Sequence, residues 1–202
     1  MKHVSTREVY AHWKDRRRDR PAPPRADIDP VAIRRALGDT FMLSTDFVDE
    51  LRFRLAGTRV CALFGREMKG ETFLDLWSEK TSDAVDELLS IITAESEGVV
   101  AGLTGRTDDG FDVELEMLLL PLLRVGRGSH GMLGVLAPTV PAYWIGTKPV
   151  VRVDFRTVRH LGAETASVPQ PMEPPPEGVE VRHGFTVYSG GRQDDPPSER
   201  SA

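Results

Sequence analysis

The chain has 202 residues and a formal net charge of -5 at pH 7, from 26 basic and 31 acidic side chains. This length suits one domain with terminal extensions, and the charge gives no general attraction to nucleic acid or anionic lipid. The single cysteine, Cys61, excludes an intramolecular disulfide and fits a reducing compartment. Because no apolar stretch is long enough for a signal peptide or a membrane span, we expect a cytoplasmic protein with no membrane partner.

The first 24 residues predict a helix and a proline-rich linker. Ser5 and Glu8 have the spacing of a capping box, so the helix should begin at Ser5 and end before Pro21. Several arginines lie near the end of this helix. Runs of like charge are usually solvated, so a solvated helix end explains them better than a phosphate or nucleotide site does. These arginines are Arg16, Arg17, Arg18 and Arg20.

Aromatic residues cluster on one side of this helix. Val9, Tyr10 and Trp13 share that side. Two arrangements account for them equally well: packing onto the chain's own core, or a seam between two copies, because aromatic side chains are common interface anchors. Together with Trp144 in the C-terminal part, these residues form the candidate interface.

Residues 25–141 have the pattern of one α+β domain. Asp29 and Pro30 supply an N-cap and a first-turn proline for a short helix that Gly38 closes. Two strands, two brief helices and one longer helix should follow, over residues 41–43, 51–55, 59–64, 73–77 and 82–97. Three further strands should complete the domain, over residues 99–107, 111–119 and 132–137.

The strand over residues 111–119 shows strict alternation. Its apolar side chains should face the core, while Asp112, Glu114 and Glu116 should lie on the solvent face and carry no acid–base chemistry. Beyond this strand, residues 126–131 are predicted to form a hairpin turn. They include Ser129 beside His130 but lack the strand-to-helix elbow of a hydrolase.

The C-terminal part divides into an extension and a tail. Residues 142–168 contain an alternating stretch at Val151–Phe155 that would form an added strand or an arm. Residues 169–202 are proline-rich and polar, so we expect a mostly flexible, irregular tail, apart from an isolated strand over residues 179–188.

Three segments of the sequence resemble the PAS domain family. They are RADIDP at Arg25–Pro30, FRLAGTRVCALFGREMKGETFLDLW at Phe53–Trp77, and GMLGVLAP at Gly131–Pro138. The similarity is to a subfamily of bacterial stand-alone PAS proteins and covers about Val9 to Pro141. It implies a five-stranded antiparallel sheet with helices on one face, a pocket or filled core between them, and frequent dimerisation.

The resemblance also directs attention to cofactors. In haem-binding members a histidine usually stands on the long helix before the third strand, but residues 82–97 contain none. In light-sensing flavin members a reactive cysteine follows the short helices, where this chain has Gly70–Leu74 without a cysteine. Cys61 is instead expected to be a small buried hydrophobe. Haem and cysteinyl flavin are therefore disfavoured, and the cofactor stays unknown.

A PAS cavity in this chain would have an apolar wall. The candidate pocket residues are Phe53, Leu55, Phe64, Phe73, Trp77, Leu88, Ile92, Leu115, Met117, Leu133 and Val135. A closed core explains the same residues equally well, because protein interiors normally pack without voids. Arg54, Arg59 and Arg66 would offer an anionic ligand a counter-charge, but solvated arginines are an equal explanation.

The sequence favours a regulatory or sensory module over an enzyme. Phosphate-binding loops, zinc-type cysteine pairs and spaced His-Glu-His arrangements are absent from it. Since the sequence contains no effector domain, signal transduction should pass through a homodimer or a separate signalling protein. The alternative is a receptor for a nucleotide second messenger or an apolar metabolite, bound in the cavity or at the N-terminal arginines. A nucleic-acid partner and a metal site are not expected.

Overall fold

The computed structural model describes residues 1–45, 50–123, 131–161, 180–182 and 185–187. The contacts divide the chain into two units, Met1–Gln170 and Pro171–Ala202. In the second unit β7 (Glu180–Arg182) pairs antiparallel with β8 (Phe185–Val187), so the stretch predicted as one strand contains two. The turn predicted at 126–131 lies almost wholly outside the described residues, as does most of the tail.

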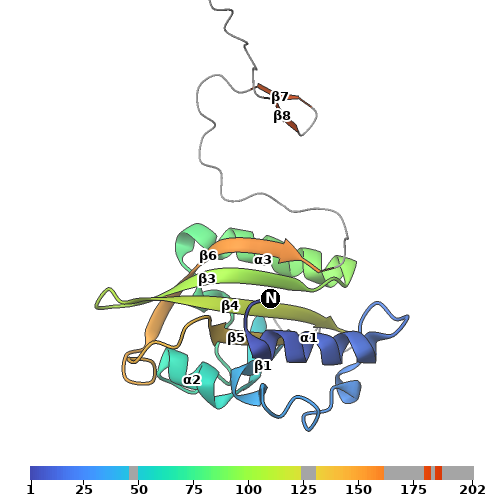
Figure 1. Cartoon of the computed structure of the whole chain (residues 1–202), viewed down its shortest axis with the longest axis horizontal. Coiled ribbons are helices and arrows are strands. Elements are labelled where there is room, and N and C mark those ends of the chain that lie inside the picture. The colour runs from blue at the N-terminus through green and yellow to red at the C-terminus, as the bar shows by residue number, and fades with distance from the viewer. Residues whose placement is uncertain (46–49, 124–130, 162–179, 183–184, 188–202) are drawn as a thin grey trace, which may run out of the picture. The chain divides into compact units, whose positions relative to one another are not determined.

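A six-stranded antiparallel sheet forms the centre of the first unit, in the order β2-β1-β5-β4-β3-β6 (Figure 1). Its strands are β1 (Thr40–Thr45), β2 (Leu51–Ala56), β3 (Val99–Thr107), β4 (Asp112–Leu122), β5 (Gly131–Pro138) and β6 (Val150–His160). The strand predicted in the extension is β6, which pairs with β3 and makes the sheet one strand wider than the family pattern implied.

Helices lie on both faces of this sheet. The α-helices are α1 (Val4–Arg17), α2 (Thr58–Phe64) and α3 (Glu79–Glu95), and the 3-10 turns are η1 (Arg25–Asp27), η2 (Leu37–Asp39) and η3 (Leu74–Leu76). One core cluster joins α2, α3 and η3 to the sheet. The other joins α1 to the opposite face, where α1 lies across β4 and β5 (Figure 1).

Covering both faces changes the character of β4. Val113, Leu115 and Met117 alternate as predicted and belong to the core beneath α3. The second half of the strand, however, is buried on both sides, and Leu118 and Leu120 pack beneath α1. Glu116 is therefore only 6% exposed, and its predicted position on the solvent face is wrong.

Three predicted helix boundaries need correction. The first helix begins at Val4, with His3 as its N-cap, because the His3 Nδ1 atom accepts the Ser5 amide. Residues 30–36 form turns instead of a helix, since the Asp29 carboxylate accepts the Val31 amide and closes a local turn. The long helix begins at Glu79 with Ser78 as its N-cap, and it ends at a left-handed Ser96 before reaching Gly98.

None of the helices among the described residues combines the length and apolar character needed to cross a bilayer.

Candidate functional site

Aromatic rings fill the space between the sheet and helices α2 and α3. Phe41 and Phe53 lie 5.4 Å apart between ring centroids, and Phe53 and Phe73 lie 5.8 Å apart. The chain of ring contacts continues from Phe73 to Trp77 at 5.7 Å and from Trp77 to Phe155 at 4.6 Å. These separations are typical of packed aromatic pairs, so this part of the interior is a hydrophobic core.

Most of the predicted pocket residues meet in this core. They are Phe53, Phe64, Phe73, Trp77, Leu88, Ile92, Leu115 and Met117. Phe41 also belongs to it but was not predicted. Its ring lies over Gly134, where a Cβ atom would come within 2.1 Å of the ring. The small residue in β5 thus makes room for a large one in β1.

Three predicted pocket residues lie elsewhere. Leu133 and Val135 pack on the α1 face, because β5 pairs Leu133 with Met42, whose side chain also belongs to that face. Leu55 is 45% exposed. A β-bulge between Met42 and Leu43 places Leu55 opposite Met42 and so moves it off the face that Phe53 occupies. These three residues cannot line a space beneath α3.

One polar atom in the aromatic core lacks a partner. Within the described residues, the buried Trp77 Nε1 atom has no hydrogen-bond acceptor. A buried indole N–H normally finds an acceptor, and an unpaired buried donor costs about 1–3 kcal/mol. A small ligand group with an acceptor atom would satisfy the hydrogen-bonding capacity of this N–H.

The candidate interface residues are largely buried within the chain. Val9 and Trp13 lie on the buried face of α1 and pack against the sheet. The Trp13 Nε1 atom donates to the Pro121 carbonyl at 2.8 Å. Trp144 is buried with its ring 6.0 Å from that of Phe111. Tyr10, stacked on Trp13, is half-buried and so keeps part of its surface for a partner. An interface at these positions stays a prediction.

A buried carboxylate joins α1 to α2. The Asp39 side chain accepts hydrogen bonds from the Ser5 hydroxyl at 2.6 Å and from Arg59 Nε and Nη2 at 2.5 and 2.8 Å. The fork of the guanidinium fits a carboxylate with both nitrogens, which raises the pKa of Arg59. Arg59 is therefore committed to Asp39. Arg66 is also paired, with Glu71 at 3.3 Å, so of the three predicted counter-charges Arg54 alone lacks a carboxylate partner among the described residues.

Glu116 anchors the N-terminal end of α1 to the sheet. Its carboxylate accepts the Lys2 amide at 2.5 Å and the His3 amide at 2.9 Å. Burial raises the pKa of Glu116, but these two amide hydrogen bonds together with Thr6 and the N-terminal ammonium outweigh it, and the net shift is downward. The carboxylate also lies where the positive end of the helix dipole favours an anion.

We expect Glu116→Gln to lower stability most at neutral pH. A lowered folded-state pKa contributes stability above the unfolded value, about 4.3, and this contribution is lost as pH falls through the folded value. Urea unfolding of both proteins at pH 7 and pH 3.5 measures the difference, which should shrink at pH 3.5. Glu114→Gln is the control, since Glu114 pairs with Arg156 on the exposed surface and should cost less than about 1 kcal/mol. An equal loss at both pH values would contradict this assignment.

The histidine, cysteine and carboxylate side chains of the described residues do not come together as a metal site. Groups of three histidine, cysteine, aspartate or glutamate residues placed for a metal ion are not found in the described ranges. Cys61 is half-buried, with its Sγ atom 3.6 Å from a carboxylate oxygen of Glu67. His12 accepts the Asp29 amide at 3.1 Å, and burial lowers its pKa.

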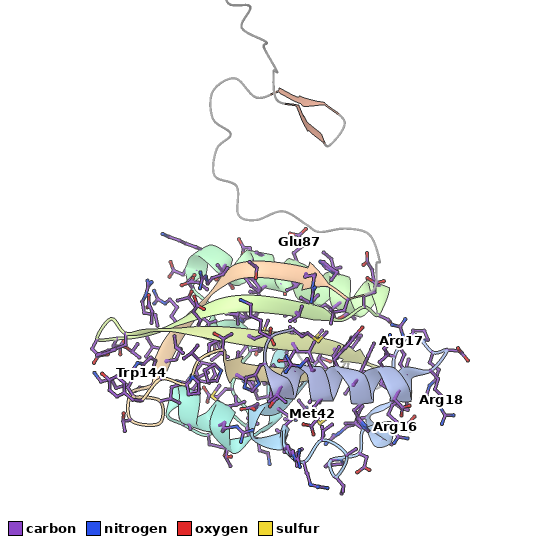
Figure 2. All side chains as sticks on the ribbon, viewed as in Figure 1. Arg16, Arg17, Arg18, Met42, Glu87 and Trp144 are labelled. Carbon is purple, nitrogen blue, oxygen red and sulfur yellow. The ribbon has the colours of Figure 1, made fainter. Side chains whose placement is uncertain are left out.

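The N-terminal arginines gather at the C-terminal end of α1, where Figure 2 labels three of them. Arg17 lies over the Trp13 ring, with its guanidinium carbon 5.4 Å from the ring centroid. Arg20 pairs with Asp27 of the RADIDP segment at 2.6 Å. Part of this cluster therefore holds the RADIDP segment near the end of α1, a role that the sequence pattern did not indicate.

A groove of about 490 Å³ opens on the α1 face, between residues 25–38 and the strands β1, β2 and β5. We call it the β1–β2 groove. Its apolar lining residues are Ile28, Ile33, Leu37, Met42, Leu55 and Leu133, with Met42 labelled in Figure 2. Sequence reasoning missed it because residues 30–36 were expected to form a helix, and because Leu55 and Leu133 were assigned to the other face.

A sequence model described as PAS domain matches residues 1–137. A search of curated proteins finds no match. Solved structures with a similar fold include the PAS domain of a protein from Colwellia psychrerythraea, at 15% identity and a TM-score of 0.39, covering 55% of this chain and 97% of that one.

Two light-oxygen-voltage proteins are also similar. One structure, from work on a flavin analogue in a light-oxygen-voltage domain, has 18% identity and a TM-score of 0.42, covering 58% of this chain and 87% of that one. The other is described as an RNA-binding light-oxygen-voltage receptor, with 18% identity and a TM-score of 0.39, covering 62% of this chain and 36% of that one.

Proposed function

The chain belongs to the PAS domain family of sensory and regulatory modules, and from that premise we propose that it is a non-catalytic regulatory module whose output passes through protein contacts. The partner is a second copy of the chain or a separate signalling protein. The observation that supports this proposal is the aromatic core beneath α2 and α3, where side chains occupy the space in which a ligand would sit.

The packing of that core favours contacts over ligand binding. Phe41, Phe53, Phe73 and Trp77 form consecutive ring contacts at 5.4 to 5.8 Å. A ligand among them would have to displace packed rings and give up their dispersion contacts. An open apolar surface lies instead on the α1 face, in the β1–β2 groove.

Native mass spectrometry of the protein isolated from its own cells tests this function. We expect a homodimer or a complex with another protein, with no bound small molecule, and an absorbance spectrum without a chromophore. Light scattering at high micromolar concentration supplies the oligomeric state. A monomer that carries no partner in either measurement would contradict the proposal.

A small-molecule receptor is the second candidate, and the unpaired Trp77 Nε1 atom favours it. A polar metabolite group that accepts this N–H would remove the cost of the buried donor. A ligand at 100 times its dissociation constant would add about 2.7 kcal/mol to the free energy of unfolding. Thermal unfolding with nucleotides and apolar metabolites measures this, and Trp77→Phe should abolish the stabilisation while keeping the ring.

A further inference from the structure

We propose that the β1–β2 groove binds an amphipathic helix of a partner protein, with acidic residues beside the apolar stripe of that helix. This inference rests on the proposed function, because it names the surface and the chemistry of a partner for the same regulatory module. It concerns the α1 face of the sheet, opposite the core where a PAS ligand would be expected.

The groove exposes apolar side chains that the chain itself leaves uncovered. Leu55 is 45% exposed and Leu37 is 37% exposed, and both line the groove. Met42 is half-buried between them and the buried Leu133. Side chains from three strands and from residues 25–38 thus form one continuous apolar lining, a feature typical of helix-binding grooves.

The backbone of the groove selects a helix over an extended peptide. Both edges of β1 are paired, with β2 on one side and β5 on the other. The outer edge of β2 is also occupied over Leu51–Phe53, since Phe53 exchanges backbone hydrogen bonds with residues 70–71 and the Leu51 carbonyl accepts the Phe73 amide. A bound segment therefore finds few free backbone partners here, and a helix satisfies its own backbone groups internally.

The charges around the groove are basic. Arg25 lines it and Arg34 is exposed on the same segment, whereas Arg35 lines a separate pocket beside Ser5 and Arg59. These three arginines form no ion pair with a carboxylate among the described residues. On the β2 side, the Arg54 Nε atom donates to the Ser44 hydroxyl at 2.5 Å and keeps its charge.

Arginines neutralise two of the three nearby carboxylates. Asp27 pairs with Arg20, and Asp39 is buried against Arg59 and Ser5. Asp29 accepts only the backbone amide of Val31, a neutral donor, and keeps its negative charge. Arg25, Arg34 and Arg54 outnumber this one carboxylate, so the surroundings of the groove carry net positive charge, which complements an acidic amphipathic helix and repels a basic one.

Fluorescence anisotropy with labelled peptides tests the proposal on the full chain. The probe is a helical peptide of about 18 residues with leucines at i, i+3, i+4 and i+7 and flanking glutamates. Its counterparts carry lysines in place of the glutamates, or two central prolines that prevent a helix. We expect the acidic helical peptide to bind at least tenfold more tightly than either counterpart.

Variants of the chain locate the binding surface. Leu55→Glu should weaken binding of the acidic peptide at least tenfold, whereas Val151→Glu, at an exposed apolar residue on the opposite edge strand, should leave it unchanged. The double variant Arg25→Glu, Arg34→Glu alters only exposed side chains and so keeps the fold. It should weaken the acidic peptide and improve binding of the lysine peptide.

Each contrary result overturns the inference in a distinct way. Failure of the acidic peptide to bind, or binding that Leu55→Glu leaves unchanged, removes the groove as the site. Equal binding of acidic and lysine peptides removes the acidic partner, and equal binding of the proline peptide removes the helix. If native mass spectrometry still finds a protein complex, the regulatory function stands and uses another surface.

Discussion

Trp13→Ala is expected to lower the free energy of unfolding by about 3–5 kcal/mol. Trp13 is 2% exposed, and it packs in the same core cluster as Leu118 and Leu120 of β4. Its indole N–H also satisfies the Pro121 carbonyl at 2.8 Å. Truncation therefore removes the largest apolar contact between α1 and the sheet and leaves a buried carbonyl without its donor.

Urea unfolding monitored by circular dichroism measures this loss. Tyr143→Ala is the matched control, because Tyr143 is an aromatic residue that is 88% exposed and should change stability by less than about 0.5 kcal/mol. Trp13→Phe should fall between the two, since it retains a ring but loses the hydrogen bond. If Trp13→Ala unfolds at the same urea concentration as the unsubstituted protein, α1 contributes nothing to the fold.

Gly57→Ala is expected to cost about 3 kcal/mol, or to prevent folding. A Cβ atom at this position would lie 2.1 Å from the Leu37 carbonyl oxygen and 2.4 Å from that of Gly38. Both contacts are with backbone, so no side-chain rotation can relieve them. The Gly57 amide also donates to the Thr40 carbonyl at 2.8 Å, which holds the start of α2 against the first residue of β1.

Gly131→Ala separates this close approach from the general cost of replacing glycine. A Cβ atom at Gly131 would have its nearest neighbours at 3.7 Å, an ordinary contact. Thermal unfolding of both variants should show a large decrease in Tm for Gly57→Ala and a small change for Gly131→Ala. Similar decreases would show that backbone crowding at η2 is not the cause.

These variants bear on the proposed function because η2 lines the β1–β2 groove and is joined to α1. Leu37 and Gly38 line the groove, and Gly57 lies against both. Asp39, the last residue of η2, binds Ser5 of α1 and Arg59 of α2. A change that loosens this junction should therefore weaken peptide binding as well as stability, whereas Tyr143→Ala should affect neither.

Alternation and turn residues in the sequence determined the order of strands and helices. Leu51 and Phe53 alternate with arginines, and Val113, Leu115 and Met117 alternate with carboxylates, so each segment has a strand period and one apolar face. The family resemblance, which the match over residues 1–137 supports, placed these segments in a PAS fold. Eight of the predicted pocket residues share the core beneath α2 and α3 for the same reason.

Tertiary structure decided which helix covers which face of the sheet. Alternation shows that a strand has two faces, but it does not show what packs on either one. By alternation Glu116 is predicted to be a solvent-face carboxylate, but the N-terminal residues just before α1 cover it, and the amides of Lys2 and His3 donate to it. By its alternation with Phe53, Leu55 is predicted to be a core residue, but the bulge at Arg54 in β2 turns it toward the groove. Both outcomes depend on contacts between residues far apart in the chain, and local periodicity carries no information about such contacts.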